Sequence, residues 1–226
     1  MTFNEQEGVD TVVFDLDGTL ADTAPDIADA LNLVLSDAGL PVFDLATITS
    51  MVGGGARTLV ERAVLRAAGT VDERLTSRLY ERFLAAYDAA PSVKSRLYPG
   101  VRAALEGLKA RRLKLGVCTN KPELLTGIVL RGLDVESYFG AVVGGSMRLS
   151  LKPAPDMLLK AIQDLGSAPE RSLMVGDSVA DVGAARAAGV PVAVFSGGYC
   201  AGPITDLRAD MVFDDYSRFF ASGRAA

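Results

Sequence analysis

The sequence predicts an α/β fold, in which a mostly parallel sheet carries helices on both faces and a small all-helical cap is inserted after the first strand. Three observations support this fold class. Short β-branched runs recur along the chain, helical patterns separate the later runs, and one long interval contains helical patterns only. Because such alternation is typical of parallel sheets covered on both faces, we expect ligands at the carboxyl ends of the strands.

The strands are predicted from runs of β-branched and aromatic residues. The first run, Val12-Val13-Phe14, is apolar throughout and ends in a glycine turn, which indicates a buried strand. The predicted strands are 11–15, 113–119, 141–144, 172–176 and 190–195, with a weaker one at 210–213.

The helices are predicted where apolar residues recur at spacings of three and four. In order, they are 26–38, 57–68, 72–90, 101–111, 123–133, 156–166 and 179–188. The first three form an uninterrupted helical block between the first and second strands, so we interpret them as an inserted subdomain. The expected division is a core of residues 1–21 and 97–226 and a cap of residues 22–96, with hinges at 18–22 and 94–99.

Composition and charge restrict the class of partner. The chain has 226 residues, 49% of them hydrophobic, which is ample for a buried core. Its net charge of -5 argues against nucleic acid and anionic membranes, because both need a basic surface. The apolar runs are too short to span a membrane, and residues 1–10 contain no apolar signal segment. We therefore expect a cytoplasmic protein.

The chain contains no histidine and only two cysteines. This excludes Ser-His-Asp triads, histidine-ligated zinc and imidazole acid/base catalysis, so carboxylates must perform any proton transfer. Cys118 lies within an apolar strand and is interpreted as a small core residue. With carboxylates as the available ligands, a bound metal is expected to be a hard cation such as magnesium.

Asp15 and Asp17 stand where the first strand breaks into the turn at Gly18. Two carboxylates at the end of a buried strand are costly to desolvate, which favours a cation site or a reactive site. The alternative is helix capping, in which Asp17 or Thr19 accepts hydrogen bonds from the amides of the next helix. This stretch alone leaves both interpretations open.

Other strand ends carry polar residues that a parallel sheet would bring to the same edge. They are Thr119, Asn120, Asp177 and Asp181, with Lys152 just beyond the third strand. Each has an ordinary alternative, since Thr119, Asn120 and Asp177 are suited to cap helices and Lys152 to a solvated loop. Their common position favours one site instead, with the groups that phosphoryl transfer through a metal requires.

At these residues the chain resembles the haloacid dehalogenase-like phosphatases, over nearly its full length. Four motifs match in order: Asp-Xaa-Asp-Gly-Thr at 15–19, the Ser/Thr motif at Thr119, Lys-Pro at 152–153, and Gly-Asp-Xaa-Xaa-Xaa-Asp at 176–181. The resemblance implies a Rossmann-like core and a helical cap. Within the family, segments 52–55, 119–121 and 188–191 most resemble phosphoglycolate phosphatases, although Ser146 and Leu151 depart from their pattern.

The resemblance implies a role for each motif residue. Asp15 is the nucleophile that forms an aspartyl-phosphate, and Asp17 protonates the leaving group and then activates water. Thr119, Asn120 and Lys152 bind the phosphoryl group.

A magnesium ion is expected on the Asp15 side chain, the Asp17 carbonyl and the Asp177 side chain. Asp181 is expected to orient a metal-bound water or Lys152. The implied reaction is magnesium-dependent hydrolysis of a small phosphomonoester by a monomer or homodimer, with 2-phosphoglycolate as the expected substrate.

Substrate specificity is expected in the cap, at Gly54, Gly55 and Arg57. Exposed amides at the start of a helix, next to an arginine, suit an anion such as a substrate carboxylate. A flexible loop with a solvated Arg57 is the alternative.

Several other functions stay open. A sugar phosphomutase of the β-phosphoglucomutase type uses the same nucleophile and metal, and sugar phosphates, sugar acid phosphates or pyrophosphate are other possible substrates. A signalling receiver module also surrounds a phosphorylated Asp with acidic residues, Thr and Lys. However, its phosphoacceptor follows the third strand rather than the first, and it has no use for a helical insert.

Overall fold

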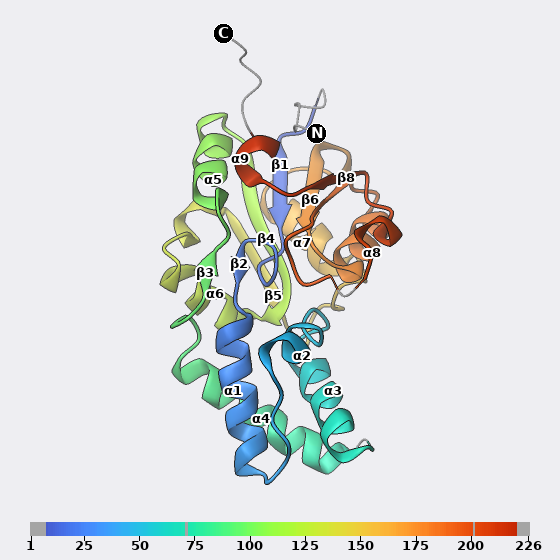
Figure 1. The fold of residues 1–226 in the computed structure, drawn as a ribbon. Coiled ribbons are helices and arrows are strands. Elements are labelled where there is room, and N and C mark those ends of the chain that lie inside the picture. The colour runs from blue at the N-terminus through green and yellow to red at the C-terminus, as the bar shows by residue number, and fades with distance from the viewer. Residues whose placement is uncertain (1–7, 71, 201, 221–226) are drawn as a thin grey trace.

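The computed structural model describes residues 8–70, 72–200 and 202–220. Residues 1–7 and 221–226, which the sequence assigned to the core, lie outside these ranges. The prediction that residues 1–7 contain no signal segment therefore also concerns residues outside the described part. In the described part, six strands form one parallel sheet in the order β5-β4-β1-β6-β7-β8 (Figure 1). The strands are β1 (Thr11–Phe14), β4 (Lys114–Pro122), β5 (Ala141–Gly145), β6 (Ser172–Gly176), β7 (Val192–Phe195) and β8 (Met211–Phe213). The predicted fold class is confirmed.

The sheet is apolar on both sides because helices cover both. In β1, Val12 and Phe14 pack in the cluster that also holds residues of α5 (Val101–Ala110), α6 (Glu123–Gly132) and α9 (Tyr216–Phe219). Val13 points the other way and packs with residues of α7 (Asp156–Asp164) and α8 (Val179–Ala188). This alternation follows from the two-residue period of a strand.

Four helices form a second body of structure below the sheet in Figure 1. They are α1 (Ala24–Asp37), α2 (Leu45–Thr49), α3 (Ala56–Ala68) and α4 (Glu73–Ala89). Their apolar stripes bury residues such as Leu31, Val60 and Phe83 against one another. The sequence did not predict α2, because five residues are too few to show helical periodicity.

The chain passes between the sheet and these helices at two adjacent points. There β2 (Ala21–Asp22) and β3 (Arg96–Leu97) pair antiparallel, with Asp22 opposite Arg96. The buried carboxylate of Asp26 ties the same points together, since it accepts hydrogen bonds from the amides of residues 94 and 95. The expected cap, 22–96, begins and ends at this pair; the division into two domains stays a prediction.

Three short 3-10 helices complete the secondary structure of the described part: Glu136–Tyr138, Pro169–Arg171 and Ile204–Leu207. No helix in the described ranges is both long enough and apolar enough to cross a membrane.

Candidate active site

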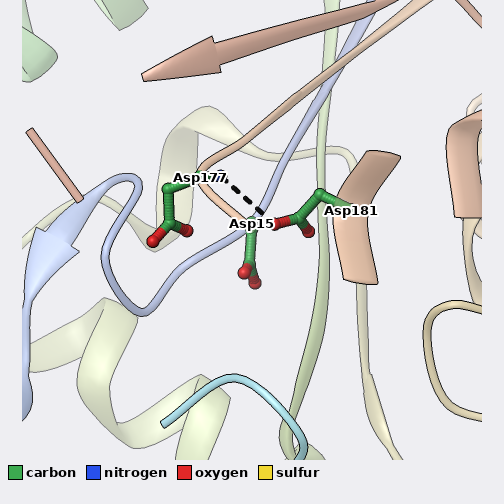
Figure 2. A group of neighbouring side chains, drawn as sticks. All are labelled: Asp15, Asp177 and Asp181. Carbon is green, nitrogen blue, oxygen red and sulfur yellow. Dashed lines mark hydrogen bonds between the residues drawn. The ribbon is translucent and has the colours of Figure 1, made fainter. Parts of the chain in front are cut away.

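Three aspartates from two neighbouring strand ends meet at the carboxyl edge of the sheet (Figure 2). Asp15 follows β1, Asp177 follows β6, and Asp181 lies in the first turn of α8. All three are buried, and one carboxylate oxygen of each lies within 4.8 Å of the others. This geometry provides oxygen ligands for a hard cation.

The turn after β1 has to pass very close to Asp177. Gly18 has a φ of 82°, and a Cβ at this position would lie 2.4 Å from Asp177 Oδ2. Only glycine combines this backbone conformation with this approach. The next residue, Thr19, donates a hydrogen bond to Asp177 Oδ1 at 2.8 Å. Capping does not explain this turn, because the residue at the start of α1 is Thr23.

The start of α8 explains how Asp177 and Asp181 are oriented. Ser178 is the N-cap residue, and Asp181 completes a capping box with it. Asp181 Oδ2 also accepts a hydrogen bond from the Asp177 amide at 3.1 Å, which Figure 2 draws as a dashed line. Because Ser178 caps the helix, the side chain of Asp177 is available to the site.

Lys152 is buried among these carboxylates rather than solvated in a loop. Its side chain is 1% exposed, and its Nζ lies 3.0 Å from Asp15 Oδ1 and 2.6 Å from Asp181 Oδ1. It also donates to the Cys118 carbonyl at 2.8 Å. The ammonium therefore stands beside Asp15, where charge on a phosphoryl group would develop.

Burial shifts the ionisation of the site. It raises the pKa of Asp15 to about 6, even though Lys152 lowers it, and the charges of Asp181 and Asp17 add to the increase. Burial and the neighbouring carboxylates also raise the pKa of Asp177 well above its usual range. For Lys152, burial lowers the pKa, but Asp15 and Asp181 outweigh it and raise the pKa overall.

Thr119 and Asn120 lie within β4, in the part where its pairing with β5 becomes irregular. Thr119 is buried and lines a pocket beside Asp15. The side chain of Asn120 is a structural tie, since its Nδ2 donates to the Gly53 and Lys152 carbonyls at 3.0 and 2.9 Å. Of the groups of Asn120, the backbone amide is therefore the one expected to bind phosphate. Neither residue caps α6, whose N-cap is Pro122.

Asp17 is held apart from the other three aspartates by residues for which the sequence predicted no role. Its carboxylate accepts hydrogen bonds from Thr23 Oγ1 at 2.5 Å and from Lys121 Nζ at 3.0 Å. Lys121 also donates to the Tyr87 hydroxyl of α4 at 2.7 Å. Segment 119–121 was notable in the sequence only because it resembles phosphoglycolate phosphatases. No neighbouring residue in the sequence indicates that Lys121 is buried.

Tyr199 is a second residue that sequence reasoning missed. Its amide donates to Asp177 Oδ2 at 2.6 Å, and its hydroxyl donates to Asp22 Oδ1 at 2.7 Å. The hydroxyl also accepts from the Thr23 amide at 2.7 Å. Tyr199 thus connects the carboxylate cluster to the point where the chain leaves the sheet.

The structure does not bring Arg57 to the carboxylates, and its expected role in binding a substrate anion stays a prediction. Its guanidinium is paired with Glu61 at 3.1 Å and with Glu73, on the exposed side of α3. The glycines beside it do approach the site. Gly55 lines the pocket next to Asp15, and Gly54 lines a neighbouring pocket that includes Lys152.

The donor set fits a divalent cation. Four carboxylates and two ammonium groups gather at this edge, so two negative charges remain unbalanced when all are ionised; the groups are Asp15, Asp17, Asp177, Asp181, Lys121 and Lys152. The raised pKa values of Asp15 and Asp177 show that these buried carboxylates lack a balancing positive charge, which a hard cation at this cluster would supply.

Comparisons with known proteins agree with this geometry. Residues 9–189 match the family model for haloacid dehalogenase-like hydrolases. The chain is 44% identical to a phosphoglycolate phosphatase of Rhodospirillum rubrum, over 91% of this chain and 87% of that protein. It is 39% identical to one of Caulobacter vibrioides, over 91% and 87%.

Among solved structures, a predicted phosphoglycolate phosphatase from Haemophilus somnus superimposes with a TM-score of 0.88. Its sequence is 33% identical, and the alignment covers 93% of this chain and 96% of that one. With the four motifs now located at one edge of the sheet, the chain belongs to the haloacid dehalogenase-like hydrolases.

Proposed function

We propose that the protein is a magnesium-dependent phosphatase that hydrolyses 2-phosphoglycolate to glycolate and inorganic phosphate through an aspartyl-phosphate on Asp15. The observation that carries the reaction class is the buried Asp15 carboxylate, 3.0 Å from the Lys152 ammonium and grouped with Asp177 and Asp181. The relatives named phosphoglycolate phosphatase support the substrate. We further propose a cytoplasmic monomer or homodimer.

In the first step, Asp15 attacks the phosphorus atom. Its Oδ1 is engaged by the Leu16 amide at 2.7 Å and by Lys152, so we assign the attack to Oδ2. The bond between phosphorus and the ester oxygen breaks as the new bond forms. Asp17 gives its proton to the ester oxygen, and glycolate leaves.

In the second step, water cleaves the aspartyl-phosphate. Asp17, now ionised, takes a proton from the water as the water oxygen attacks phosphorus, and inorganic phosphate and the Asp15 carboxylate are released. Thr119 and the Asn120 amide hold the phosphoryl oxygens in both steps, and Lys152 offsets their negative charge.

A magnesium ion bound to the Asp15 and Asp177 side chains and the Asp17 carbonyl supplies the charge that lets an anionic nucleophile approach an anionic phosphate. Asp181 does not bind the ion in this proposal, because its oxygens already accept hydrogen bonds from Lys152, Ser178 and the Asp177 amide. It fixes the position of Lys152 instead.

The test is phosphate release from 2-phosphoglycolate by the wild type and by Asp15→Asn, with magnesium and with a chelator. We expect the variant to lose activity by about 1,000-fold or more, since an amide is a poor nucleophile at this position. Asp10→Asn, at the opposite end of β1, is the matched control and should stay active. Magnesium-dependent turnover by Asp15→Asn would overturn the mechanism.

A further inference from the structure

The pocket next to Asp15 is lined mostly by apolar side chains. Among the described residues that line it, Lys121 is the one cation. Helices α1, α3 and α4 and the carboxyl edge of the sheet form its walls, which include Ile27, Val52, Leu59, Phe83, Tyr87 and Leu125. A polar substrate group that enters this pocket past Asp15 and Asp17 therefore meets one positive charge, with apolar side chains around the rest of the wall.

Lys121 is held rigidly and is charged. Its side chain is 2% exposed, and its Nζ contacts the two Asp17 oxygens at 3.0 and 3.3 Å. The same atom lies 4.5 Å from the centre of the Tyr87 ring, in addition to its hydrogen bond to the Tyr87 hydroxyl. Burial lowers the pKa of Lys121, but Asp17 and Tyr87 outweigh it and raise the pKa overall.

The position of Lys121 matches the size of the substrate. Asp17 has to contact the ester oxygen in order to protonate it, and Lys121 is one hydrogen bond beyond Asp17. In 2-phosphoglycolate a single CH2 separates the ester oxygen from the carboxylate, so the carboxylate oxygens lie about 3–4 Å from the ester oxygen. A carboxylate held at this distance beside Asp17 reaches the Lys121 ammonium.

Charge complementarity gives the same result. The Lys121 ammonium is a three-donor cation buried in this pocket, where it donates to the Asp17 carboxylate and to the Tyr87 hydroxyl. A substrate carboxylate beside it accepts a charge-assisted hydrogen bond, whereas a neutral group accepts a weaker one.

The other cations near the site are committed elsewhere. Lys152 pairs with Asp15 and Asp181, and Arg62, which lines the neighbouring pocket, donates to the Met51 carbonyl at 2.9 Å. Arg57 is turned toward Glu61.

We propose that the Lys121 ammonium binds the carboxylate of the substrate, and so selects phosphate esters that carry a carboxylate on the carbon next to the ester oxygen. The inference rests on the proposed function, because it uses Asp17 as the proton donor and 2-phosphoglycolate as the substrate. It makes the residue after the phosphate-binding segment, rather than Arg57 of the cap, the determinant of specificity.

The experiment compares kcat/KM for 2-phosphoglycolate and for its neutral amide, 2-phosphoglycolamide, which has the same shape. The enzymes are the wild type, Lys121→Met, Lys121→Gln and a control, Lys114→Met. Lys114 lies at the opposite end of the same strand and donates to the Gly166 carbonyl. Lys121→Gln is the second variant in case Lys121→Met does not fold, because the glutamine amide can still donate a hydrogen bond to Asp17.

We expect the wild type and Lys114→Met to prefer the acid over the amide by about 100-fold, as is typical of a charged hydrogen bond in a dry pocket. Both Lys121 variants should prefer it by less than about fivefold. The readout is the ratio of the two kcat/KM values, because loss of Lys121 also disturbs Asp17 and so affects both substrates.

Two outcomes overturn the inference: a wild type without preference, and Lys121 variants that lose activity equally on both substrates and so keep the full preference. The proposed function fails separately. In that case the wild type releases phosphate from p-nitrophenyl phosphate but from neither 2-phosphoglycolate nor its amide, and the assignment of Lys121 falls with it.

Discussion

Replacing Lys152 by methionine tests whether the buried ammonium holds the carboxylate cluster together. Methionine is an unbranched side chain one atom shorter than lysine, so it keeps most of the volume and removes the charge. The change takes the cation away from Asp15 at 3.0 Å and Asp181 at 2.6 Å, in a place where the lysine side chain is 1% exposed. Removing one partner of a buried ion pair costs about 3–5 kcal/mol of stability. For a chain of this size that lowers Tm by about 6–20 °C.

The loss should depend on pH in a direction that the structure fixes. Burial raises the pKa of Asp15 from 3.8 to about 6, and Lys152 acts against this, so its removal raises the pKa further. A carboxyl whose pKa is higher in the folded protein stabilises the fold at low pH, and this contribution is lost as pH rises through that window. Lys152→Met should therefore lie closest to the wild type near pH 5, where Asp15 is protonated, and furthest from it above about pH 7.

Thermal unfolding followed by circular dichroism, in chelator and from about pH 5 to 8, measures this difference. The matched control is Lys160→Met, which breaks an exposed ion pair with Asp164 and should shift Tm by less than about 2 °C at every pH. A deficit in Lys152→Met that stays constant across this range would refute the coupling to Asp15. A deficit as small as the control's would refute the buried pair itself.

Three further outcomes are expected. Magnesium at about 100 times its Kd should raise Tm of the wild type by about 5–10 °C near pH 8. The rise should be much smaller near pH 5, because protons compete with the ion for Asp15. Asp177→Asn should remove the shift, and an equal shift in that variant would contradict the metal site. Asp26→Ala leaves the part-buried amide of residue 94 and the buried amide of residue 95 without an acceptor, so urea denaturation should show a loss of about 2–4 kcal/mol, and a loss below about 1 kcal/mol would show that the tie is dispensable. Arg57→Ala should change turnover of 2-phosphoglycolate and of p-nitrophenyl phosphate by less than about twofold each, while a selective loss on 2-phosphoglycolate would restore the anion-binding role.

The sheet and its reactive edge were predictable because both depend on regular patterns. A run such as Val12-Val13-Phe14 shows a buried strand directly, and parallel topology then brings Asp15 and Asp177 to one edge. The short elements β2, β3 and α2 escaped prediction, since two to five residues carry no period. They form because neighbouring segments supply their partners.

Lys121 and Arg57 show where local sequence is insufficient. Lys121 is buried by Asp17, 104 residues away, and by Tyr87, 34 residues away, so nothing beside it in the sequence distinguishes it from a solvated lysine. Arg57 is the reverse case, because its local sequence suggests a binding role. Its place at a helix start favours anion binding, but Glu61 and Glu73 already occupy the guanidinium.

The position of β1 in the middle of the sheet also has a consequence for synthesis of the chain. This strand is made before both of its neighbours, which are β4, at Lys114–Pro122, and β6, at Ser172–Gly176. Helices α1 to α4 have mostly local contacts and can form while the chain is still on the ribosome. The apolar β1 segment can pair with β4 on one side, but its other edge stays unpaired and prone to aggregation until β6 has been made.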